Sequence, residues 1–330
     1  MATERIISGT AVSEQDERVN WSLRPERFDD FVGQRELLER LTIAAEAARA
    51  RSEPMEHTLL HGPPGLGKTT LAHVLAAEMG TRAHVTSGPA LTRGTDLVGA
   101  LTRLEAGDLL FIDEIHRMPA AVEEFIYPAM EDHRIDVTVD SGMHGRTVSI
   151  SLKPFTVIGA TTRAGMVSAP LRSRFGVSHH LEFYSAPDLL TIVTRSAHLL
   201  GMVIDEPAAL ELIAGRSRGT PRIVNRLLRR VRDYAQVRMD GRVTTACVEE
   251  ALALEGVDAL GLDELDRKYL KAIATVYDGG PVGLEAIAAT MGEDSGTLED
   301  VVEPFLLQIG FLARTRRGRQ LTDAGAERCC

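Results

Sequence analysis

The chain has 330 residues, 44% of them hydrophobic and 25% charged, which is enough for two or three domains with sizeable cores. Its net charge of −10 argues against a protein that coats nucleic acid through bulk charge, although a local basic site stays possible. Three cysteines, two of them adjacent, make neither a disulfide framework nor a zinc site. With no apolar leader and no stretch that could span a bilayer, the sequence predicts a soluble cytoplasmic protein without a membrane partner.

The first part of the chain reads as an alternation of helices and strands. Residues 1–20 are polar and are expected to form a flexible arm. From Trp21 the expected elements are a helix at 36–51, strands at 58–60, 83–86 and 109–112, a helix at 119–130 and a strand at 155–160. Such alternation is typical of a parallel sheet covered by helices on both faces. We therefore expect an α/β domain over residues 21–184.

A glycine-rich loop of sequence GPPGLGKT spans residues 62–69, between the strand at 58–60 and a helical pattern. Its glycines are Gly62, Gly65 and Gly67. They allow a tight turn whose N–H groups point inward, where the helix N-terminus adds positive potential. Lys68 can reach the β- and γ-phosphates, and Thr69 can place a hydroxyl on Mg²⁺. A chance glycine-rich turn is the alternative, but the strand and helix on either side favour a nucleoside triphosphate site.

Two acids follow the apolar run at 109–112, which is typical of a strand buried on both faces. Asp113 and Glu114 thus stand at the carboxyl end of a strand, where doubly wound sheets hold ligands. Asp113 fits the Walker B role of holding Mg²⁺, directly or through water, and Glu114 fits that of polarising the attacking water. Two solvated acids are the usual alternative for a lone pair, and the loop at 62–69 makes it the weaker interpretation.

A β-hairpin is predicted as an insertion at about 134–153, where apolar and polar residues alternate on both sides of a turn at 141–145. A two-stranded ribbon is marginally stable alone and leaves an apolar face that needs cover. Packing on its own domain and docking of a partner are both open on the sequence.

The last part of the chain changes character. Strands are expected to disappear from Ala186, so residues 185–256 read as a small all-α domain. Residues 257–330 have the pattern of a winged helix, three helices and then a hairpin turning at 316–318. The third helix carries the acids Glu299, Asp300 and Glu303, and the wing carries Arg314, Arg316, Arg317 and Arg319. We expect the acids to repel phosphates and the wing to grip the DNA backbone without reading sequence, a solvated turn being the alternative.

Four more segments, together with the loop and the two acids, resemble the RuvB family, the AAA+ motors of Holliday-junction branch migration. They are RP at 24–25 with FVGQ at 31–34, GATTRAG at 159–165, LRSRFG at 171–176 and GTPR at 219–222. The likeness continues through EPF at 303–305 and GFL at 310–312, and covers nearly all of residues 21–325. It implies an AAA+ P-loop parallel-sheet domain at 21–184, a small all-α lid domain at 185–256 and a C-terminal winged-helix DNA-binding domain at 257–330.

The resemblance also implies roles for single residues. Thr161 and Thr162 would sense the γ-phosphate. Arg174 would be the arginine finger that reaches a neighbouring subunit's nucleotide, with Arg172 as the competing candidate. Further nucleotide contacts implied in this way are Leu23 and Arg24 beside the adenine, Thr70 in the phosphate loop, Tyr184 near the base, Arg222 on the phosphates, and Glu131, Asp132 and His133 near the nucleotide. His133 stands where the family is expected to have an aromatic residue.

For partners, the resemblance implies that Arg314 and Arg319 contact DNA and that the inserted hairpin docks the junction-binding protein RuvA. Arg316 stands where the family is expected to have proline, which makes this wing less stiff and more charged. A finger acting in trans requires a head-to-tail interface, which closes into a ring; a homo-hexamer is implied, with the RuvC resolvase as a further partner. The expected function is ATP- and Mg²⁺-dependent branch migration of Holliday junctions, on duplex DNA of any sequence.

Three other functions are weighed against this one. A clamp-loader-type ATPase predicts a C-terminal collar of helices, against which the predicted wing argues. A protein unfoldase would want an aromatic pore loop after the second strand, and residues 86–101 contain no aromatic residue. A nucleotide-gated DNA switch that hydrolyses slowly is disfavoured by Glu114 and Arg174, which both serve turnover.

Overall fold

The structure is a computed structural model that describes residues 21–138 and 147–328, and these residues group into two units. The first unit comprises residues 24–62 and 67–182. The second comprises residues 21–23, 63–66 and 183–328 of the described chain. None of the helices in the two described ranges has both the length and the hydropathy that a bilayer span requires.

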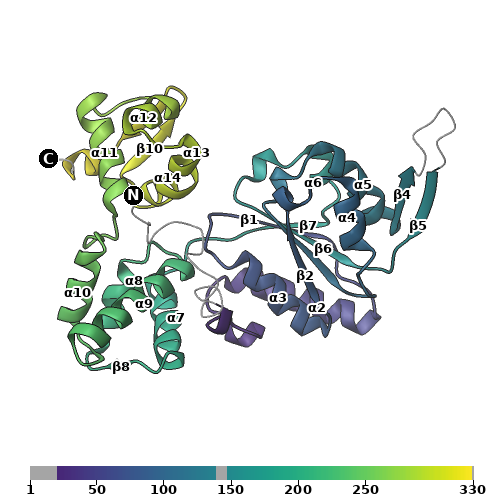
Figure 1. Ribbon diagram of the computed structural model, residues 1–330, viewed down its shortest axis with the longest axis horizontal. Coiled ribbons are helices and arrows are strands. Elements are labelled where there is room, and N and C mark those ends of the chain that lie inside the picture. Colours follow the sequence, from purple (N-terminus) through teal and green to yellow (C-terminus); the bar gives the residue numbers. More distant parts are fainter. Residues whose placement is uncertain (1–20, 139–146, 329–330) are drawn as a thin grey trace. The chain divides into compact units, whose positions relative to one another are not determined.

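A five-stranded parallel sheet with strand order β2-β3-β6-β1-β7 forms the centre of the first unit (Figure 1). Its strands are β1 (Thr58–His61), β2 (Ala83–Ser87), β3 (Leu109–Asp113), β6 (Thr156–Thr161) and β7 (Val177–His180). All residues of β6 are buried, and β3 is buried up to Asp113, because helices cover both faces. The predicted parallel sheet is confirmed, and β7 is an edge strand that the sequence analysis did not predict.

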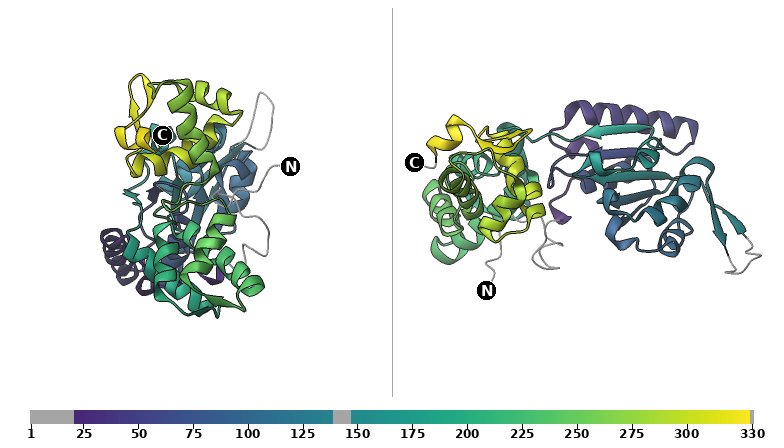
Figure 2. Two further views of the ribbon diagram at one scale, coloured as in Figure 1. Left: turned by 90° about the vertical axis from the view of Figure 1, so that its left-hand side faces the viewer. Right: turned by 90° about the horizontal axis from the view of Figure 1, so that it is seen from above.

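Helices lie on both faces of this sheet, α2 and α3 on one and α4, α5 and α6 on the other (Figures 1 and 2). Their bounds are α2 (Arg35–Arg51), α3 (Lys68–Met79), α4 (Gly94–Leu101), α5 (Ala120–Asp132) and α6 (Ala169–Arg172). Short 3-10 turns are η1 (Phe28–Asp30), η2 (Gly88–Ala90), η3 (Ile115–Arg117) and η4 (Ala164–Met166). One apolar core joins α4 and α5 to strands β1, β3 and β6. This core fixes the carboxyl ends of three neighbouring strands at one edge.

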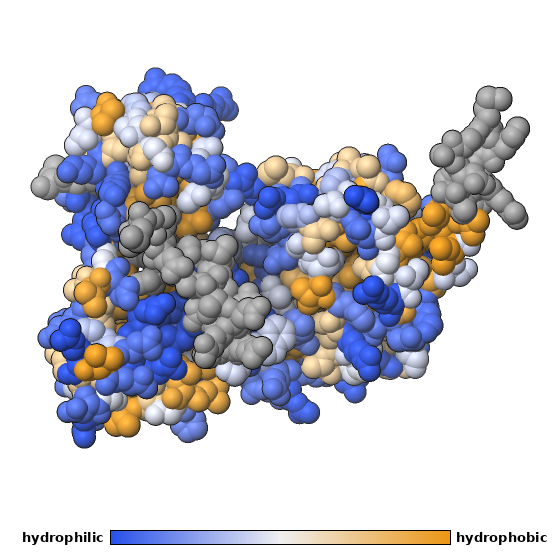
Figure 3. Space-filling model, viewed as in Figure 1, coloured by the Kyte–Doolittle hydropathy of each residue, from blue (hydrophilic) through white to orange (hydrophobic). Residues whose placement is uncertain are grey.

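The predicted hairpin is present as β4 (Arg134–Thr138) and β5 (Thr147–Ser151), paired in antiparallel register. Its predicted turn at 141–145 lies outside the described residues. At the base, Ile135 is buried and Val137 packs on the core of the unit, whereas Val148 is 41% exposed. The described part of the hairpin projects from the sheet, and hydrophobic surface gathers beside it (Figures 1 and 3). The base of the apolar face is therefore covered by its own domain, while Val148 stays exposed, and docking of a partner stays a prediction.

The second unit contains a helical part and a winged helix. The helical part consists of α7 (Ala186–Leu199), α8 (Pro207–Gly215), α9 (Pro221–Arg238) and α10 (Thr245–Leu254). It also contains a parallel pair of two-residue strands, β8 (Val203–Ile204) and β9 (Arg242–Val243). The expectation that strands disappear after Ala186 is corrected in this detail, because two residues are too few to leave a periodic signal in the sequence.

The winged helix follows the predicted order. Its elements are α11 (Glu264–Val276), α12 (Leu284–Met291), α13 (Ser295–Thr297), a π-helical turn η5 (Leu298–Val302), α14 (Glu303–Gln308), the wing strands β10 (Leu312–Thr315) and β11 (Gly318–Leu321), and α15 (Asp323–Glu327). Arg316 and Arg317 form the turn of the wing. Arg218 of the helical part and Asp266 of α11 make an ion pair with both side chains buried, and the Arg218 guanidinium lies 4.5 Å from the Phe305 ring centroid. These contacts explain why the two parts form one unit.

Candidate functional site

The glycine loop has the geometry of a phosphate cradle. Gly62, Gly65 and Gly67 all have positive φ, of +142°, +82° and +96°. A Cβ at Gly62 would lie 2.5 Å from the carbonyl oxygen of Leu181, so a larger residue would displace the backbone. Lys68 begins α3 and is buried, with its Nζ donating to the Gly62 carbonyl at 2.8 Å. The loop thus holds an ammonium group beside a helix N-terminus, as a phosphate site requires.

The two acids after β3 differ in their backbone. Asp113 is extended from the strand and its Oδ1 accepts the Glu114 N–H at 2.9 Å. Glu114 lies in the left-handed region with φ +46°, which is uncommon for a residue with a side chain. Its Oε2 accepts a hydrogen bond from Arg117 Nη1 at 3.0 Å, and both side chains are about half exposed. Arg117 therefore holds the carboxylate that is expected to act on water, which agrees with the structural or supporting role that its place after the two acids suggests.

Thr161 and Thr162 at the end of β6 are not equivalent. Thr161 is only 1% exposed, and its Oγ1 accepts the Arg163 N–H at 2.9 Å and lies 2.9 Å from His116 Nδ1. Thr162 is partly exposed, and its hydroxyl makes no hydrogen bond to any residue that the structure describes. Since Thr161 is committed to the protein, Thr162 has the hydroxyl that is available to a ligand.

Arg174 lies over an aromatic ring and beside an acid. Its guanidinium carbon is 4.2 Å from the Tyr127 ring centroid, and its Nη2 is 3.2 Å from Glu131 Oε1. Its Nη1 donates to the Pro170 carbonyl at 2.7 Å. The competing candidate, Arg172, instead donates to the carbonyl of Ala164 at 2.6 Å and thereby closes its own loop. The geometry favours Arg174, because its guanidinium also lies over the Tyr127 ring and beside Glu131, whereas that of Arg172 bonds to carbonyls of its own loop.

Tyr127 is in turn fixed by the buried Glu123, which accepts from its hydroxyl at 2.8 Å and from Ser168 Oγ at 2.6 Å. Burial, then the hydrogen bond to Glu123, raises the pKa of Tyr127 above its ordinary value, so the phenol stays a donor. Tyr127 and Glu123 carry no motif of their own, and their part in holding Arg174 was missed for that reason.

The other residues implied at the nucleotide fall in several places. Thr69 and Thr70 lie in the first turn of α3, partly exposed. Asp132 pairs with Arg134 at 3.3 Å, and the His133 ring lies edge-on to Phe155 with centroids 5.7 Å apart. Arg24 lowers the pKa of His73, after burial as the larger cause. In the second unit, Leu23 is buried, Tyr184 Oη donates to the Leu66 carbonyl at 3.2 Å, and the Arg222 N–H donates to the Gly65 carbonyl at 3.4 Å.

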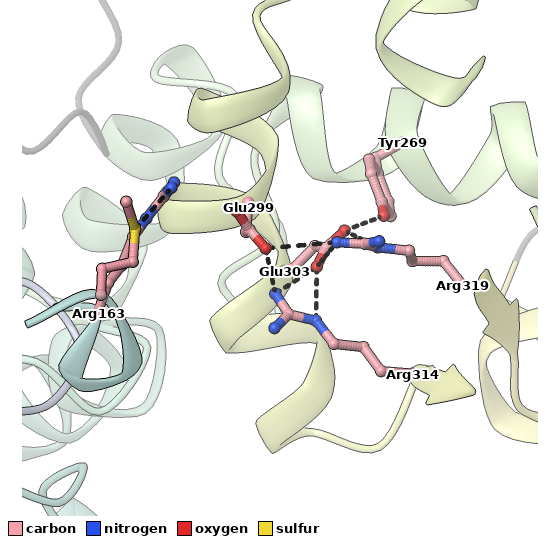
Figure 4. Close-up of polar contacts among 7 residues, drawn as sticks. Arg163, Tyr269, Glu299, Glu303, Arg314 and Arg319 are labelled. Atoms are coloured by element: carbon pink, nitrogen blue, oxygen red, sulfur yellow. Dashed lines mark hydrogen bonds and ion pairs between the residues drawn. The ribbon is translucent and has the colours of Figure 1, made fainter. Parts of the chain in front are cut away.

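The wing arginines require a correction to the expectation for the third helix. Glu303 does not face DNA phosphates: its side chain is 0% exposed and accepts hydrogen bonds from Arg314 Nε and Arg319 Nε, each at 2.8 Å (Figure 4). The helix turns this acid toward the wing, which a list of charges in sequence order does not reveal. Arg316 and Arg317 are exposed, and neither has an ion-pair partner within the described ranges.

Three family models match the chain in succession. They are the Holliday junction DNA helicase RuvB P-loop domain at residues 23–181, the RuvB AAA lid domain at 184–258 and the RuvB C-terminal winged helix domain at 259–328.

Individual relatives agree with these models. The Holliday junction branch migration complex subunit RuvB of Desulfosudis oleivorans is 60% identical over 304 residues, which are 92% of this chain and 88% of that protein. The structure of the Thermotoga maritima RuvB Holliday junction branch migration motor is 50% identical, with a TM-score of 0.85 over 93% of this chain and 98% of that one. A variant of the same Thermotoga protein gives a TM-score of 0.86, over 93% and 97% of the two chains. The chain therefore belongs to the RuvB family of AAA+ ATPases, the motors of Holliday-junction branch migration.

Proposed function

We propose that this chain hydrolyses ATP with the groups at one edge of its sheet and uses the energy to drive duplex DNA through four-way junctions. The observation that carries the proposal is the juxtaposition of three strand ends. The strands β3, β6 and β1 are neighbours, and Asp113, Thr162 and the loop at 62–69 follow them at the same edge. In an open parallel sheet this edge is where ligands bind.

Lys68 and the inward N–H groups of the loop bind the phosphates in this proposal. The residues also fit Mg²⁺: Asp113 offers a partly exposed carboxylate and Thr69 a hydroxyl, the oxygen ligands that this ion prefers. When bound, the ion neutralises charge on the phosphate oxygens. Glu114 orients the attacking water once its carboxylate leaves Arg117, and Thr162, rather than Thr161, donates its hydroxyl toward the γ-phosphate.

Arg174 acts across a subunit boundary in this proposal, neutralising charge on the phosphoryl group of the neighbouring protomer. Its pairing with Glu131 and Tyr127 keeps the guanidinium presented while no nucleotide is in reach. A residue that acts in trans requires a head-to-tail interface, which closes into a ring. We propose a homo-hexamer, in which Tyr184 and Arg222 add contacts to the base and phosphates, together with Leu23, Arg24, Thr70, Asp132 and His133.

The partners are proposed from two exposed features. The hairpin β4–β5 presents Val148 and docks RuvA, and the wing presents Arg316 and Arg317 to the backbone of duplex DNA beside Arg314 and Arg319. RuvC is a further partner, acting on the same junction, and the cytoplasm is the proposed location. The proposed domains are 21–184, 185–256 and 257–330.

The test is a branch-migration assay with the full chain, ATP, Mg²⁺, RuvA and a synthetic four-way junction with homologous arms. We expect two duplex products from the parent protein and none from Lys68→Ala, which removes the phosphate contact. Lys153→Ala is the matched control, because Lys153 lies away from the glycine loop and pairs only with Glu105 among the described residues. A parent protein that hydrolyses ATP with DNA present yet never converts the junction would contradict the proposal and favour a loader-type ATPase.

A further inference from the structure

Arg314 and Arg319 stand directly opposite each other on the wing strands. Two like charges at opposed positions repel each other, so the hairpin needs an acid between them. Glu303 supplies it from α14, outside the hairpin: its Oε2 accepts from Arg314 Nε and its Oε1 from Arg319 Nε, each at 2.8 Å (Figure 4). The Tyr269 hydroxyl donates to the same Oε1 at 2.7 Å. Each guanidinium thus turns its Nε edge toward the interior of the domain.

Glu303 cannot leave this position at low cost. Its side chain is 0% exposed, and a buried carboxylate is tolerated only when it is paired and fully hydrogen-bonded. Burial opposes the charge of Arg319, but the hydrogen bond and charge of Glu303 outweigh it and hold the pKa of Arg319 above its ordinary value. Arg319 is therefore charged in the folded domain, and the buried Glu303 side chain, bonded to both guanidinium groups, is a fixed point.

Glu299 makes a different kind of contact. It lies one helical turn before Glu303, and its side chain is 34% exposed. Its Oε1 is 3.5 Å from Arg319 Nη2 and 4.0 Å from Arg314 Nη2, well beyond the 2.8 Å bonds of Glu303 (Figure 4). A single carboxylate oxygen that lies between two guanidinium groups at these distances stands where one phosphate oxygen would bind. Neither Nη1 atom bonds to another part of the described chain, so each can add a second contact to the same phosphate.

We propose that Arg314 and Arg319 form one phosphate subsite for duplex DNA, with Glu303 as its positioning residue and Glu299 as a placeholder that the phosphate displaces. The inference rests on the proposed binding of DNA by the wing. The inference also predicts how DNA binds. Glu299 moves into solvent when the phosphate binds, and the two guanidinium groups stay where Glu303 holds them. Before DNA binds, the formal charges of the two acids and the two arginines sum to zero. The subsite therefore attracts a phosphate group only weakly until Glu299 has moved away.

The first test measures fluorescence anisotropy of a labelled duplex of arbitrary sequence with the full chain, at several salt concentrations. Glu299→Gln is expected to bind about twofold to fivefold more tightly than the parent, since it removes a partly exposed carboxylate that competes with the phosphate for Arg314 and Arg319. Glu285→Gln is the matched control, because it removes an exposed acid of the same domain that contacts neither arginine. Equal gains for the two variants would overturn the placeholder.

The second test concerns Glu303. Glu303→Gln is expected to bind about tenfold more weakly, because both guanidinium groups lose a charged anchor. The logarithm of the binding constant should also depend less steeply on the logarithm of the salt concentration. A loss of stability alone would lower the fraction of folded protein but would leave this slope unchanged for the molecules that stay folded. Thermal melts show whether the variant folds. Tyr269→Phe removes one hydrogen bond to Glu303 and keeps its charge, so it decides the matter if Glu303→Gln does not fold. Duplex binding unchanged in a folded Glu303→Gln, or in Tyr269→Phe in its place, would overturn the positioning role.

The third test separates this inference from the function on which it rests. If Arg314→Ala with Arg319→Ala binds duplex as well as the parent, the subsite is overturned. If binding also survives the replacement of Arg316 and Arg317 by Ala in that background, the wing is not the DNA contact and the proposed function of this domain fails. If that double variant binds weakly, the wing contact stands. Glu299→Gln should then have no effect in the double-variant background. A gain that persists there would overturn the subsite alone.

Discussion

Each of the two units holds arginines with a proposed function next to an acid of the same unit, but the acids differ in burial. Glu131, the partner of Arg174 in the first unit, is 55% exposed, whereas Glu303, the partner of Arg314 and Arg319, is 0% exposed. An exposed ion pair breaks at little cost, while a buried charge that loses its partner is strongly destabilising. The first arrangement suits a side chain that must engage and release a nucleotide in every cycle. The second arrangement suits a pair of DNA-binding side chains that keep their positions throughout the cycle.

Removing the releasable arginine has the largest expected effect. Arg174→Ala should lower kcat for ATP by about 10³-fold or more, because Lys68 and Mg²⁺ do not replace the positive charge that Arg174 brings to the transferred phosphoryl group from the neighbouring subunit, while nucleotide affinity stays close to that of the parent. Steady-state hydrolysis and equilibrium nucleotide binding measure the two quantities. Arg172→Ala is the control, since the Arg172 side chain donates its hydrogen bonds to carbonyls of its own loop, at Ala164 and Val167.

Mixing subunits shows whether the finger acts in trans. Arg174→Ala subunits retain Glu114, and Glu114→Gln subunits retain Arg174, so a mixed ring contains interfaces with both groups intact. Partial recovery of hydrolysis is expected on mixing the two inactive proteins. A mixture as inactive as either variant would indicate that Arg174 acts on the nucleotide of its own subunit. The contrast between a releasable arginine in the first unit and a fixed pair in the second would then lose its functional meaning.

The adjacent residues Thr161 and Thr162 of the first unit differ in their hydroxyl groups: that of Thr161 is hydrogen-bonded within the protein, and that of Thr162 is available to a ligand. Thr162→Val should lower kcat by about 10²-fold, the usual loss when one donor to a developing charge is removed. Thr161→Val should instead lower the free energy of unfolding, by about 1–3 kcal/mol, since it removes the hydrogen bonds that the buried Thr161 makes with Arg163 and His116. Hydrolysis rates and chemical denaturation of both variants give the answer. The reverse pattern would make Thr161 the sensor.

Changing the wing arginines sharpens the contrast with Arg174. Arg314→Ala with Arg319→Ala should weaken all duplex sequences alike, by roughly tenfold, and reduce the salt slope by about 2, one for each lost phosphate contact. It should also lower the melting temperature, because Glu303 is left buried without a cation. Arg316→Ala with Arg317→Ala should reduce the slope without that loss of stability. A sequence-selective loss would indicate readout of base edges.

The smallest expected effect is a dependence of stability on pH that is larger in the first unit than in the second. Burial lowers the pKa of His57 from 6.5, and its ring is held neutral between the Met130 carbonyl and the Val157 N–H. Burial is also the largest cause of the lowered pKa values of His61, His73 and His179.

The unfolded chain binds more protons than the folded one below pH 6.5, so this stability is complete above 6.5 and is lost as the pH falls toward the lowered values. Hydrogen exchange at pH 7.5 and 5.5, corrected for intrinsic rates, should show loss of protection in the first unit. Residues 183–328 contain a single histidine and should change less. His57→Gln should make the difference smaller. Equal loss in both units would refute this account.

The sequence determined the features that depend on neighbours along the chain. The loop at 62–69 needs glycine at fixed spacing after a strand, and Asp113 and Glu114 need only to end an apolar run, so short-range order is sufficient to predict them. The order of helices and strands, and with it the three-part organisation, followed from periodicity in the same way. The edge strand β7 and the pair β8–β9 were missed because they are short and only partly buried.

Tertiary structure decided what each polar side chain is free to do. Two adjacent threonines look alike in sequence, yet packing commits Thr161 and leaves Thr162 available. Glu303 looked like an acid that faces DNA, and the fold buries it against two arginines from another element. Charge and hydrogen bonding act through space, so their outcome depends on which face of a helix meets which strand, and a linear pattern does not contain that information.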